Sequence, residues 1–339
     1  ATPLRSNEEF WKDGEINWFT IEDIREQGRI IRTTNQKITK LGFESSSVKL
    51  LPPNTVLLCC TASVGEYAIT EVELTTNQQF NGLVVNDDYK DKLLPKFLFH
   101  LASTFKEELI RLSGKTSFNF VSVGTLRQIK IPLPPLAVQQ EIVSKIEQYE
   151  KIIAGAKQVV DNYKPQIDVN PYWEMVELGK IIKLSSGRGL TQQNMVEGEY
   201  PVYGGNGING YHNEYFIEDP IIVIGRVGAY CGSIHTTLPK AWVTDNGLYV
   251  TEYLLPINQD YLAQLLVQLE LNRFAKVGGQ PSISQTTVYE RLIPLPSIDE
   301  QTAIVEKLKH EQQLIKNNFE LIQVFEQKIK DEINKLWSE

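Results

Sequence analysis

The stretch IKIPLPPLAVQQEIVSKIEQYEKII, residues 129–153, decides the organisation of the chain, because a close copy of it occurs later. Residues 291–315 read RLIPLPSIDEQTAIVEKLKHEQQLI, with Ile-Pro-Leu-Pro at the same place. Gln139 then aligns with Gln301 without a gap. In both copies the two prolines exclude helix, and an amphipathic run follows them. The chain is therefore an internal repeat in which a proline-containing connection leads into a long helix.

The similarity of the two copies extends upstream more loosely. Each copy contains strand-like strings, then a helix, then a glycine-containing loop before the Ile-Pro-Leu-Pro string. The matched strings are CTASVGEYAI (60–69) with IGRVGAYCGSI (224–234), TTNQQFNGLVV (75–85) with VTDNGLYV (243–250), and LPKFLFHLAS (94–103) with NQDYLAQLLVQL (258–269). Strands and helices do not alternate regularly, which favours an α+β fold over a doubly wound sheet.

The helix after each Ile-Pro-Leu-Pro string is unusually long. Apolar residues recur at spacings of three and four over about 28 and about 38 residues, or roughly 40 and 57 Å at 1.5 Å per residue. An apolar stripe of this length must be buried against another surface, so we expect the helices to pair antiparallel as a coiled-coil spacer. The alternative is that each helix packs only on its own domain. The spacer or partner interface is predicted at Ile142, Ile146, Ile304, Leu308 and Phe319.

These elements predict two similar mixed α/β domains with two long helices. The expected divisions are residues 1–135 for the first domain, 136–165 for its helix, 166–172 for a linker, 173–297 for the second domain and 298–339 for its helix.

Bulk composition sets limits on function. The formal net charge of −8 means that nucleic-acid binding needs local segregation of charge. Three cysteines without a framework spacing indicate a reducing, cytoplasmic setting. The four histidines show no metal-site spacing, so no metal site is expected. No apolar run approaches twenty residues, and no leader precedes the first domain, which predicts a soluble, untargeted protein.

Two strings resemble catalytic motifs without their context. Gly114-Lys115-Thr116 ends like a phosphate-binding loop, but Leu109 stands where the first glycine is required and the preceding residues look helical. The string NPYW (170–173) is similar to the catalytic string of adenine methyltransferases, but it lacks a proline and lies in a linker. We interpret it as a turn.

Basic residues gather in windows without acids. Such windows are residues 27–43, 111–140, 178–196 and 271–289. Lys and Arg neutralise phosphate, whereas Asn, Gln and Ser hydrogen-bond base edges, so these windows predict DNA contacts. The alternative is a set of solvated loops. The candidate DNA-binding residues are Arg5, Lys37, Lys115, Ser117, Asn119, Arg188, Asn206, Arg226, Lys276, Gln280 and Ser282.

The string YPVYGGNGINGYHNEY (200–215) raises a related question. Its tyrosines Tyr203 and Tyr211 either face a groove together with Asn206 or pack beneath a glycine hairpin. Arg226, at the end of an apolar strand, either reaches phosphate or pairs with an acid. Trp242 is expected in the core rather than at a contact.

Together these strings resemble the specificity (S) subunit of type I restriction–modification systems. The resemblance rests on the doubled proline string with its following glutamine, and on strings such as YPVYGGNGINGY (200–211), IIVIGRVGAYCG (221–232) and WVTDNGLYV (242–250). It covers nearly the whole chain. It implies two target recognition domains and two conserved helical regions, with no catalytic site.

The resemblance also implies partners. Two modification (M) subunits would carry S-adenosylmethionine and methylate adenine, and restriction (R) subunits would use ATP and Mg for translocation and cleavage. Double-stranded DNA with a bipartite target would be read by the two domains, about 34 Å apart per helical turn. The rivals are an autonomous methyltransferase or nuclease, and a protein-binding adaptor without DNA contact.

The two copies differ at their start. The second domain opens with PYWEMVELGKII (171–182) before LSSGRG, whereas Ala1-Thr2-Pro3 aligns near Gly187-Arg188. We therefore expect the first domain to lack an edge strand or to receive it otherwise.

Overall fold

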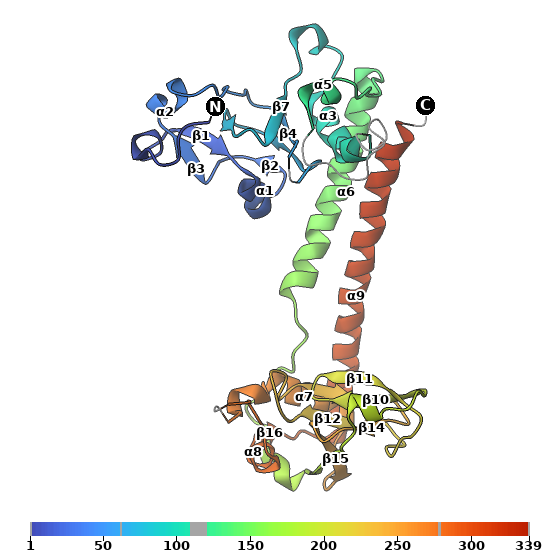
Figure 1. Cartoon of the computed structure of the whole chain (residues 1–339). Coiled ribbons are helices and arrows are strands. Elements are labelled where there is room, and N and C mark those ends of the chain that lie inside the picture. The colour runs from blue at the N-terminus through green and yellow to red at the C-terminus, as the bar shows by residue number, and fades with distance from the viewer. Residues whose placement is uncertain (1, 62, 109–120, 277–278, 338–339) are drawn as a thin grey trace. The chain divides into compact units, whose positions relative to one another are not determined.

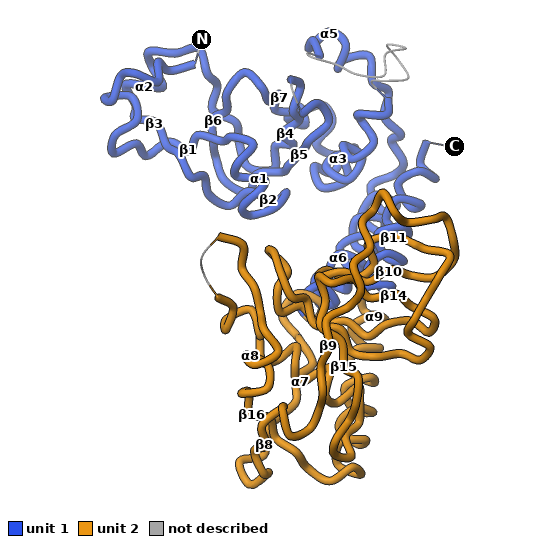
Figure 2. Tube along the Cα trace, turned by 60° about the horizontal axis from the view of Figure 1, so that its bottom comes forward, with its two compact units in different colours: residues 1–158, 319–339 blue, residues 159–318 orange. Residues whose placement is uncertain are grey.

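The computed structural model describes residues 2–61, 63–108, 121–276 and 279–337 (Figure 1). The chain divides into two compact units, which Figure 2 colours separately. Unit 1 comprises residues 1–158 and 319–339, and unit 2 comprises residues 159–318.

Unit 1 contains two small sheets, with strand orders β3-β1-β6 and β2-β5-β4-β7. Its strands are β1 (Ile16–Phe19), β2 (Ile30–Ile31), β3 (Gln36–Ile38), β4 (Val56–Cys59), β5 (Tyr67–Thr70), β6 (Thr75–Thr76) and β7 (Phe80–Leu83). Its short helices are α1 (Ile21–Gln27), α2 (Lys40–Glu44), α3 (Pro95–Leu101) and α5 (Val123–Leu126).

Unit 2 contains sheets of order β11-β10-β14, β13-β12-β15-β9 and β16-β8. Its strands are β8 (Met175–Glu177), β9 (Ile182–Ser186), β10 (Tyr200–Gly204), β11 (Gly207–His212), β12 (Ile222–Gly225), β13 (Ile234–Thr236), β14 (Trp242–Val243), β15 (Gly247–Tyr253) and β16 (Leu292–Pro294). Its short helices are α7 (Gln259–Gln268) and α8 (Gln285–Tyr289).

The two units repeat one fold. In the three-stranded sheets, β1 pairs antiparallel with β3 and parallel with β6, and β10 pairs in the same way with β11 and β14. In the four-stranded sheets, the antiparallel order β5-β4-β7 recurs as β13-β12-β15. The predicted α+β fold with two similar domains is confirmed.

The fourth strand of the larger sheet differs between the units. In unit 2, β9 pairs with β15, and β8 pairs with β16. In unit 1, no described strand pairs with the second edge of β7, and β2 instead lies parallel to β5. The first copy thus lacks a described counterpart of the β8–β9 segment, as the alignment of the two copies predicted.

Each unit buries its helix and the first turns of a long helix in one core. In unit 1, Phe97 and Leu101 of α3 pack with Val143 and Ile146. In unit 2, Tyr261 and Leu265 of α7 pack with Val305 and Leu308. Apolar side chains at helical spacing meet a sheet face in each case, which removes both surfaces from water.

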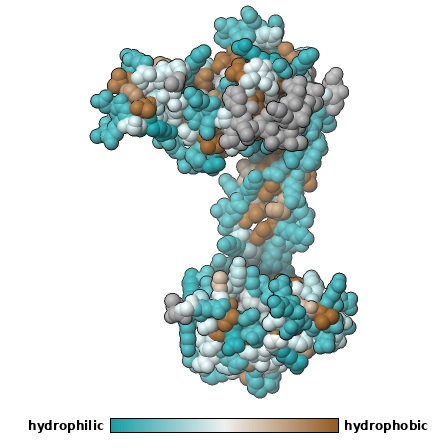
Figure 3. Space-filling model, in the orientation of Figure 1, coloured by the Kyte–Doolittle hydropathy of each residue, from teal (hydrophilic) through white to brown (hydrophobic). Residues whose placement is uncertain are grey.

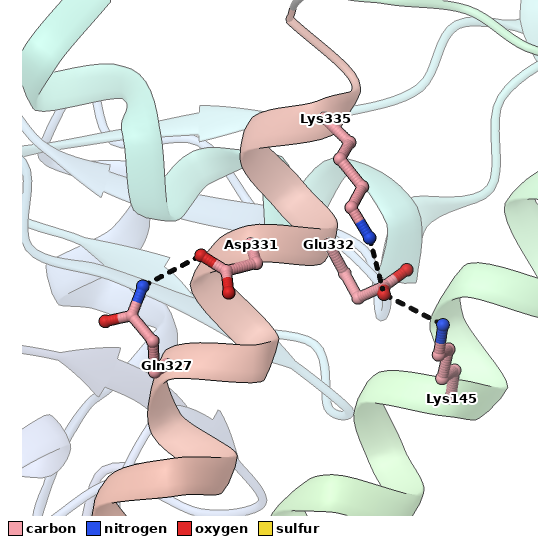
Figure 4. Close-up of polar contacts among 5 residues, drawn as sticks. All are labelled: Lys145, Gln327, Asp331, Glu332 and Lys335. Atoms are coloured by element: carbon pink, nitrogen blue, oxygen red, sulfur yellow. Dashed lines mark hydrogen bonds and ion pairs between the residues drawn. The ribbon is translucent and has the colours of Figure 1, made fainter.

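The long helices are α6 (Leu136–Asn162) and α9 (Ile298–Lys335). In unit 1, Lys145 Nζ lies 2.8 Å from Glu332 Oε1, and Figure 4 shows Lys335 approaching the same carboxylate. The rings of Tyr149 and Phe325 lie 5.1 Å apart. In unit 2, Tyr163 hydrogen-bonds Glu311. Residues later in α6 contact residues earlier in α9, so the two helices are antiparallel.

The five residues predicted for the spacer lie in different surroundings. Ile142 and Ile146 pack in the unit 1 core, which also receives Ile333 from the end of α9. Ile304 and Leu308 pack in the unit 2 core. Phe319 is 52% exposed. The first turns of each helix therefore belong to its own globular core, and the last turns of α9 pack in the unit 1 core and contact α6.

Within the described ranges, no helix is both long enough and apolar enough to cross a membrane.

Candidate nucleic-acid interface

Arg226 lies where three segments of unit 2 meet. Its backbone N–H donates to the carbonyl of Asn246 (2.8 Å), and its own carbonyl accepts from Ile283 (2.9 Å). Its guanidinium Nη1 lies 3.3 Å from Ser186 Oγ and 3.4 Å from the carbonyl oxygen of Asp245. The end of β9, the turn after β14 and the loop before α8 are thereby held around one cation.

The loop before α8 brings further candidates to this place. Ser282 forms isolated bridges with both Val227 and Lys276, and the N–H of Gly228 donates to the carbonyl of Pro281 (2.9 Å). Gly228 has φ +87°, and a Cβ there would lie 3.4 Å from Gln280 Nε2. Lys276, Gln280 and Ser282 thus share one loop cluster with Arg226.

Arg188 is exposed, and its backbone is held by strand β14. Its N–H donates to the carbonyl of Val243 (2.9 Å), and its carbonyl accepts from Trp242 Nε1 (3.1 Å). Its guanidinium stacks 4.2 Å from the ring centroid of Phe216. The backbone is fixed while the charged group stays in solvent.

Asn206 occupies the tip of the β10–β11 hairpin. It is exposed, and a Cβ on neighbouring Gly205 would lie 3.4 Å from the carbonyls of both Asn246 and Val227. The hairpin tip therefore packs beside the Arg226 cluster. The glycine-rich string at 200–215 therefore contains a β-hairpin, as one of the two interpretations of the sequence required.

The two tyrosines of this hairpin divide between the two alternatives: Tyr203 packs beneath the hairpin, and Tyr211 does not. Tyr203 is only 5% exposed, and its hydroxyl accepts from the N–H of Leu238 (3.0 Å). Tyr203 packs in a small apolar cluster with Ile217, Val223, Ala241 and Val243. Tyr211 remains exposed, and Trp242 is half-buried between His212 and Phe216.

The acid-free windows overstate the free positive charge. Acids pair with many of these cations, some from a neighbouring turn of the chain and some from distant parts of it. The pairs are Arg29 with Glu66, Arg32 with Glu71, Lys40 with Glu44, Lys180 with Glu177, Lys183 with Glu252, and Arg273 with Glu270. By contrast, no described carboxylate lies within ion-pair distance of five candidates: Arg5, Lys37, Arg188, Arg226 and Lys276.

A polar hollow of about 670 Å³ adjoins Arg188. Its lining includes Gln192, Asn194, Asn209, Asp245 and Asn246. The candidate set omitted these residues, although the amide-rich strings at 191–194 and 244–246 carried the signal. Amide side chains around a hollow suit recognition of polar base edges.

In unit 1, Arg5 and Lys37 line a smaller hollow. Arg5 Nη1 donates to Gln36 Oε1 (2.6 Å), and its guanidinium lies 4.1 Å from the ring centroid of Trp11. Both cations, with Asn35, line a hollow of about 540 Å³. Lys37 projects from β3, the edge strand that corresponds to β11. The candidates Lys115, Ser117 and Asn119 lie outside the described residues.

In unit 1, Cys60 occupies the position that is equivalent to Arg226. The N–H of Cys60 donates to Gln79 (2.7 Å), and its carbonyl accepts from Val121 (2.8 Å), which repeats the backbone bonds of Arg226. Cys60 is buried, and burial raises the pKa of its thiol, so the group is neutral. The two units therefore differ in charge at one equivalent point.

Of the two strings that resemble catalytic motifs, NPYW (170–173) lies within the described residues, and Gly114-Lys115-Thr116 lies outside them. At NPYW, Asn170 Oδ1 accepts from the N–H of Tyr172 (3.0 Å), and the side chain of Tyr172 is 93% exposed, as expected for a turn. In the part of the chain that the structure describes, no group of three His, Cys, Asp or Glu side chains is placed to hold a metal ion.

Comparisons with known proteins point to one family. The family model of the type I restriction modification DNA specificity domain matches residues 1–162 and 170–334. The EcoprrI specificity subunit of Escherichia coli is 30% identical over 331 residues, covering 89% of this chain and 82% of that protein. The MjaIX specificity subunit of Methanocaldococcus jannaschii is 27% identical, covering 58% of this chain and 51% of that protein.

Solved structures share the fold. A chain from a study of complex assembly and conformational transition in a type I restriction–modification system superposes with TM-score 0.63 at 19% identity, covering 96% of this chain and 90% of that one. The HsdS subunit of Thermoanaerobacter tengcongensis gives TM-score 0.54 at 19% identity, covering 90% and 86%.

Two matches to one DNA specificity domain span almost all of a chain whose two units repeat one fold, and the chain therefore belongs to the family of type I restriction–modification specificity subunits.

Proposed function

We propose that each unit reads one half of a split double-stranded DNA target, and that the chain positions partner subunits which carry out the chemistry. One observation carries this proposal above the others. Arg188, Arg226 and Lys276 have no described carboxylate within ion-pair distance, and amide and hydroxyl side chains of unit 2 lie next to them. Such a mixture suits phosphate and base-edge contacts at once.

The two kinds of contact have different effects. Unpaired cations neutralise phosphates and release counterions, which gives affinity that falls with salt concentration. The amides around the hollow next to Arg188 would accept and donate hydrogen bonds to base edges in the major groove, which gives sequence selectivity. The net charge of −8 then serves to disfavour DNA contact elsewhere on the surface.

Partner subunits are proposed from the family and from the long helices. Two M subunits with S-adenosylmethionine, and R subunits with ATP and Mg, would assemble on the chain in the cytoplasm. The helices offer exposed apolar side chains, namely Ile152, Leu314, Phe319, Leu321 and Val324. Figure 3 shows apolar side chains at the surface of the helical part. A surface of this kind suits a protein partner.

The direct test is DNA binding by the chain in complex with its M subunits. Selection from randomised duplexes should recover a specific sequence, and affinity should fall steeply as salt rises. The isolated chain with labelled S-adenosylmethionine should transfer no methyl group to DNA. Methyl transfer without a partner would favour an autonomous enzyme, and salt-independent binding would favour a protein adaptor.

A further inference from the structure

Two glutamines are buried at equivalent places in the two units. Gln139 is in the first turn of α6 and is 0% exposed, whereas Gln301 is in the first turn of α9 and is 1% exposed. Neither residue is part of the proposed DNA interface. Complete burial of a polar side chain is costly unless its groups are hydrogen-bonded, so their partners show what each amide does.

Gln139 joins three segments of unit 1. Its Nε2 donates to the carbonyl of Pro134 (2.7 Å), in the Ile-Pro-Leu-Pro connection, and to the carbonyl of Lys92 (2.7 Å). Its Oε1 accepts from the N–H of Leu94 (2.9 Å), the residue that precedes α3. The amide thus ties the long helix to the proline connection and to the start of the domain's own helix.

Gln301 repeats this arrangement in unit 2. Its Nε2 donates to the carbonyl of Pro296 (2.9 Å), and its Oε1 accepts from the N–H of Asn258 (2.8 Å), which caps α7. Two units with different sequences therefore use one amide in the same way, between the same three segments.

A second contact farther along each long helix supports the same geometry. Lys96 of α3 pairs with Glu147 of α6 at 2.6 Å, and Asp260 of α7 pairs with Lys309 of α9 at 2.6 Å. The basic residue of the pair lies on the domain helix in unit 1 and on the long helix in unit 2, at equivalent positions. An ion pair thus joins the domain helix to the long helix in both units, although the sign of the charge on each helix differs.

Apolar packing alone would leave this joint poorly defined. Burial of apolar surface is non-directional, so a helix can turn or slide on a core at modest cost. A buried amide with directional bonds on both its oxygen and its nitrogen has no alternative partners, because movement would strand buried donors and acceptors. The glutamines therefore set the orientation of each long helix on its domain.

We propose that Gln139 and Gln301 are positioning residues that fix each recognition unit on its long helix and thereby restrict the gap that the complex accepts between two half-targets. This inference rests on the proposed function, since a gap has meaning only for a split target. Neither residue contacts DNA in this proposal, so the half-target sequences themselves should not change.

The test uses the chain in complex with its M subunits and a set of duplexes whose half-targets are separated by different gaps. Gln139→Glu and Gln301→Glu keep the accepting oxygen but remove the donors, and Gln140→Glu and Gln313→Glu are exposed controls on the same helices. We expect preference for the native gap over gaps one base pair longer or shorter to fall about tenfold in the first two variants. Both controls should retain it.

The outcomes separate the inference from the proposed function. Variants that keep the wild-type gap preference would overturn the positioning role while leaving split recognition intact. A wild-type complex with no gap preference would instead contradict split recognition itself.

Amide hydrogen exchange gives a readout that does not depend on the variants folding. In the wild-type complex, the N–H groups of Leu94 and Asn258 should be protected as strongly as the domain cores. Exchange at the rate of surface loops would show that the joints open freely and would overturn the inference.

Discussion

At the scale of single residues, the two units show how side-chain chemistry changes on a constant backbone. Cys60 and Arg226 make the same pair of backbone hydrogen bonds, yet one side chain is a buried neutral thiol and the other is a cation without a carboxylate partner among the described residues. The backbone bonds of the loop are therefore the same in both units although the two side chains differ in burial and charge. This separation lets one scaffold carry different recognition surfaces.

Arg226→Gln should weaken DNA binding by the assembled complex. Removal of one phosphate contact should reduce the slope of log affinity against log salt by about 0.9. Lys183→Gln is the control, because Lys183 already pairs with Glu252. Fluorescence anisotropy across a salt series measures both. An unchanged slope for Arg226→Gln would show that this guanidinium does not contact phosphate.

His100 should make stability depend on pH. It is 6% exposed, and burial lowers its pKa to about 4, although Glu147 opposes this effect. The folded pKa lies below the unfolded value, so stability is complete above about pH 6.5 and is lost as pH falls towards 4. The loss is on the order of 3 kcal/mol.

Urea unfolding at pH 7 and at pH 4.5 measures this loss. His100→Gln should show a smaller difference between the two pH values than wild type, and the exposed His310→Gln should behave as wild type. Equal pH dependence in wild type and His100→Gln would contradict a neutral buried imidazole.

At the scale of elements, α9 contributes to both cores. Its first turns place Val305 and Leu308 in the unit 2 core, and its last turns place Ile333 in the unit 1 core. Unit 1 is therefore completed by residues nearly two hundred positions away from α6. Apolar periodicity predicted the helix and its length, but no periodicity states which core a given turn enters.

Ile333→Ala should destabilise unit 1, since Ile333 is 4% exposed. Truncation of a buried isoleucine costs about 2–5 kcal/mol, which includes the cavity left behind. Val324→Ala, at a side chain that is 51% exposed, should cost much less. Denaturant unfolding followed by hydrogen exchange in residues 95–101 measures the effect. Similar losses in the two variants would show that the end of α9 is not core.

Phe319→Asp should reduce assembly with the M subunits. Its side chain is 52% exposed on α9, so a charge there disturbs an apolar docking surface but not a core. Co-purification with the M subunit measures assembly, and thermal unfolding of the isolated chain should stay unchanged. Glu320→Lys is a neighbouring exposed control. Full recovery of M with Phe319→Asp would exclude this face.

The candidate interface could be predicted only in part, for two physical reasons. Acid-free windows included Arg188 and Lys276, which have no described carboxylate within ion-pair distance, but Arg29, Arg32 and Lys183 pair with glutamates that are distant in sequence. Strands of two residues, such as β2 and β14, are too short to show a period, so their pairing was not predictable. The helices and the repeat were predictable because their patterns extend over many residues.

At the scale of the whole molecule, the central claim is that two copies of one fold read two parts of one target. The two units match in sheet order and pairing, which the doubled proline string had predicted. They differ in edge strand and in charge at the Arg226 position. Two similar scaffolds with different surfaces are suited to two half-targets of different sequence.

The most direct measurement is genome-wide mapping of methylated adenine in a strain that carries this chain with its M partner, against the same strain without the chain. The account predicts that the methylated adenines lie in two short motifs separated by a constant stretch of unspecified sequence. A single uninterrupted motif, or methylation that does not depend on the chain, would contradict it.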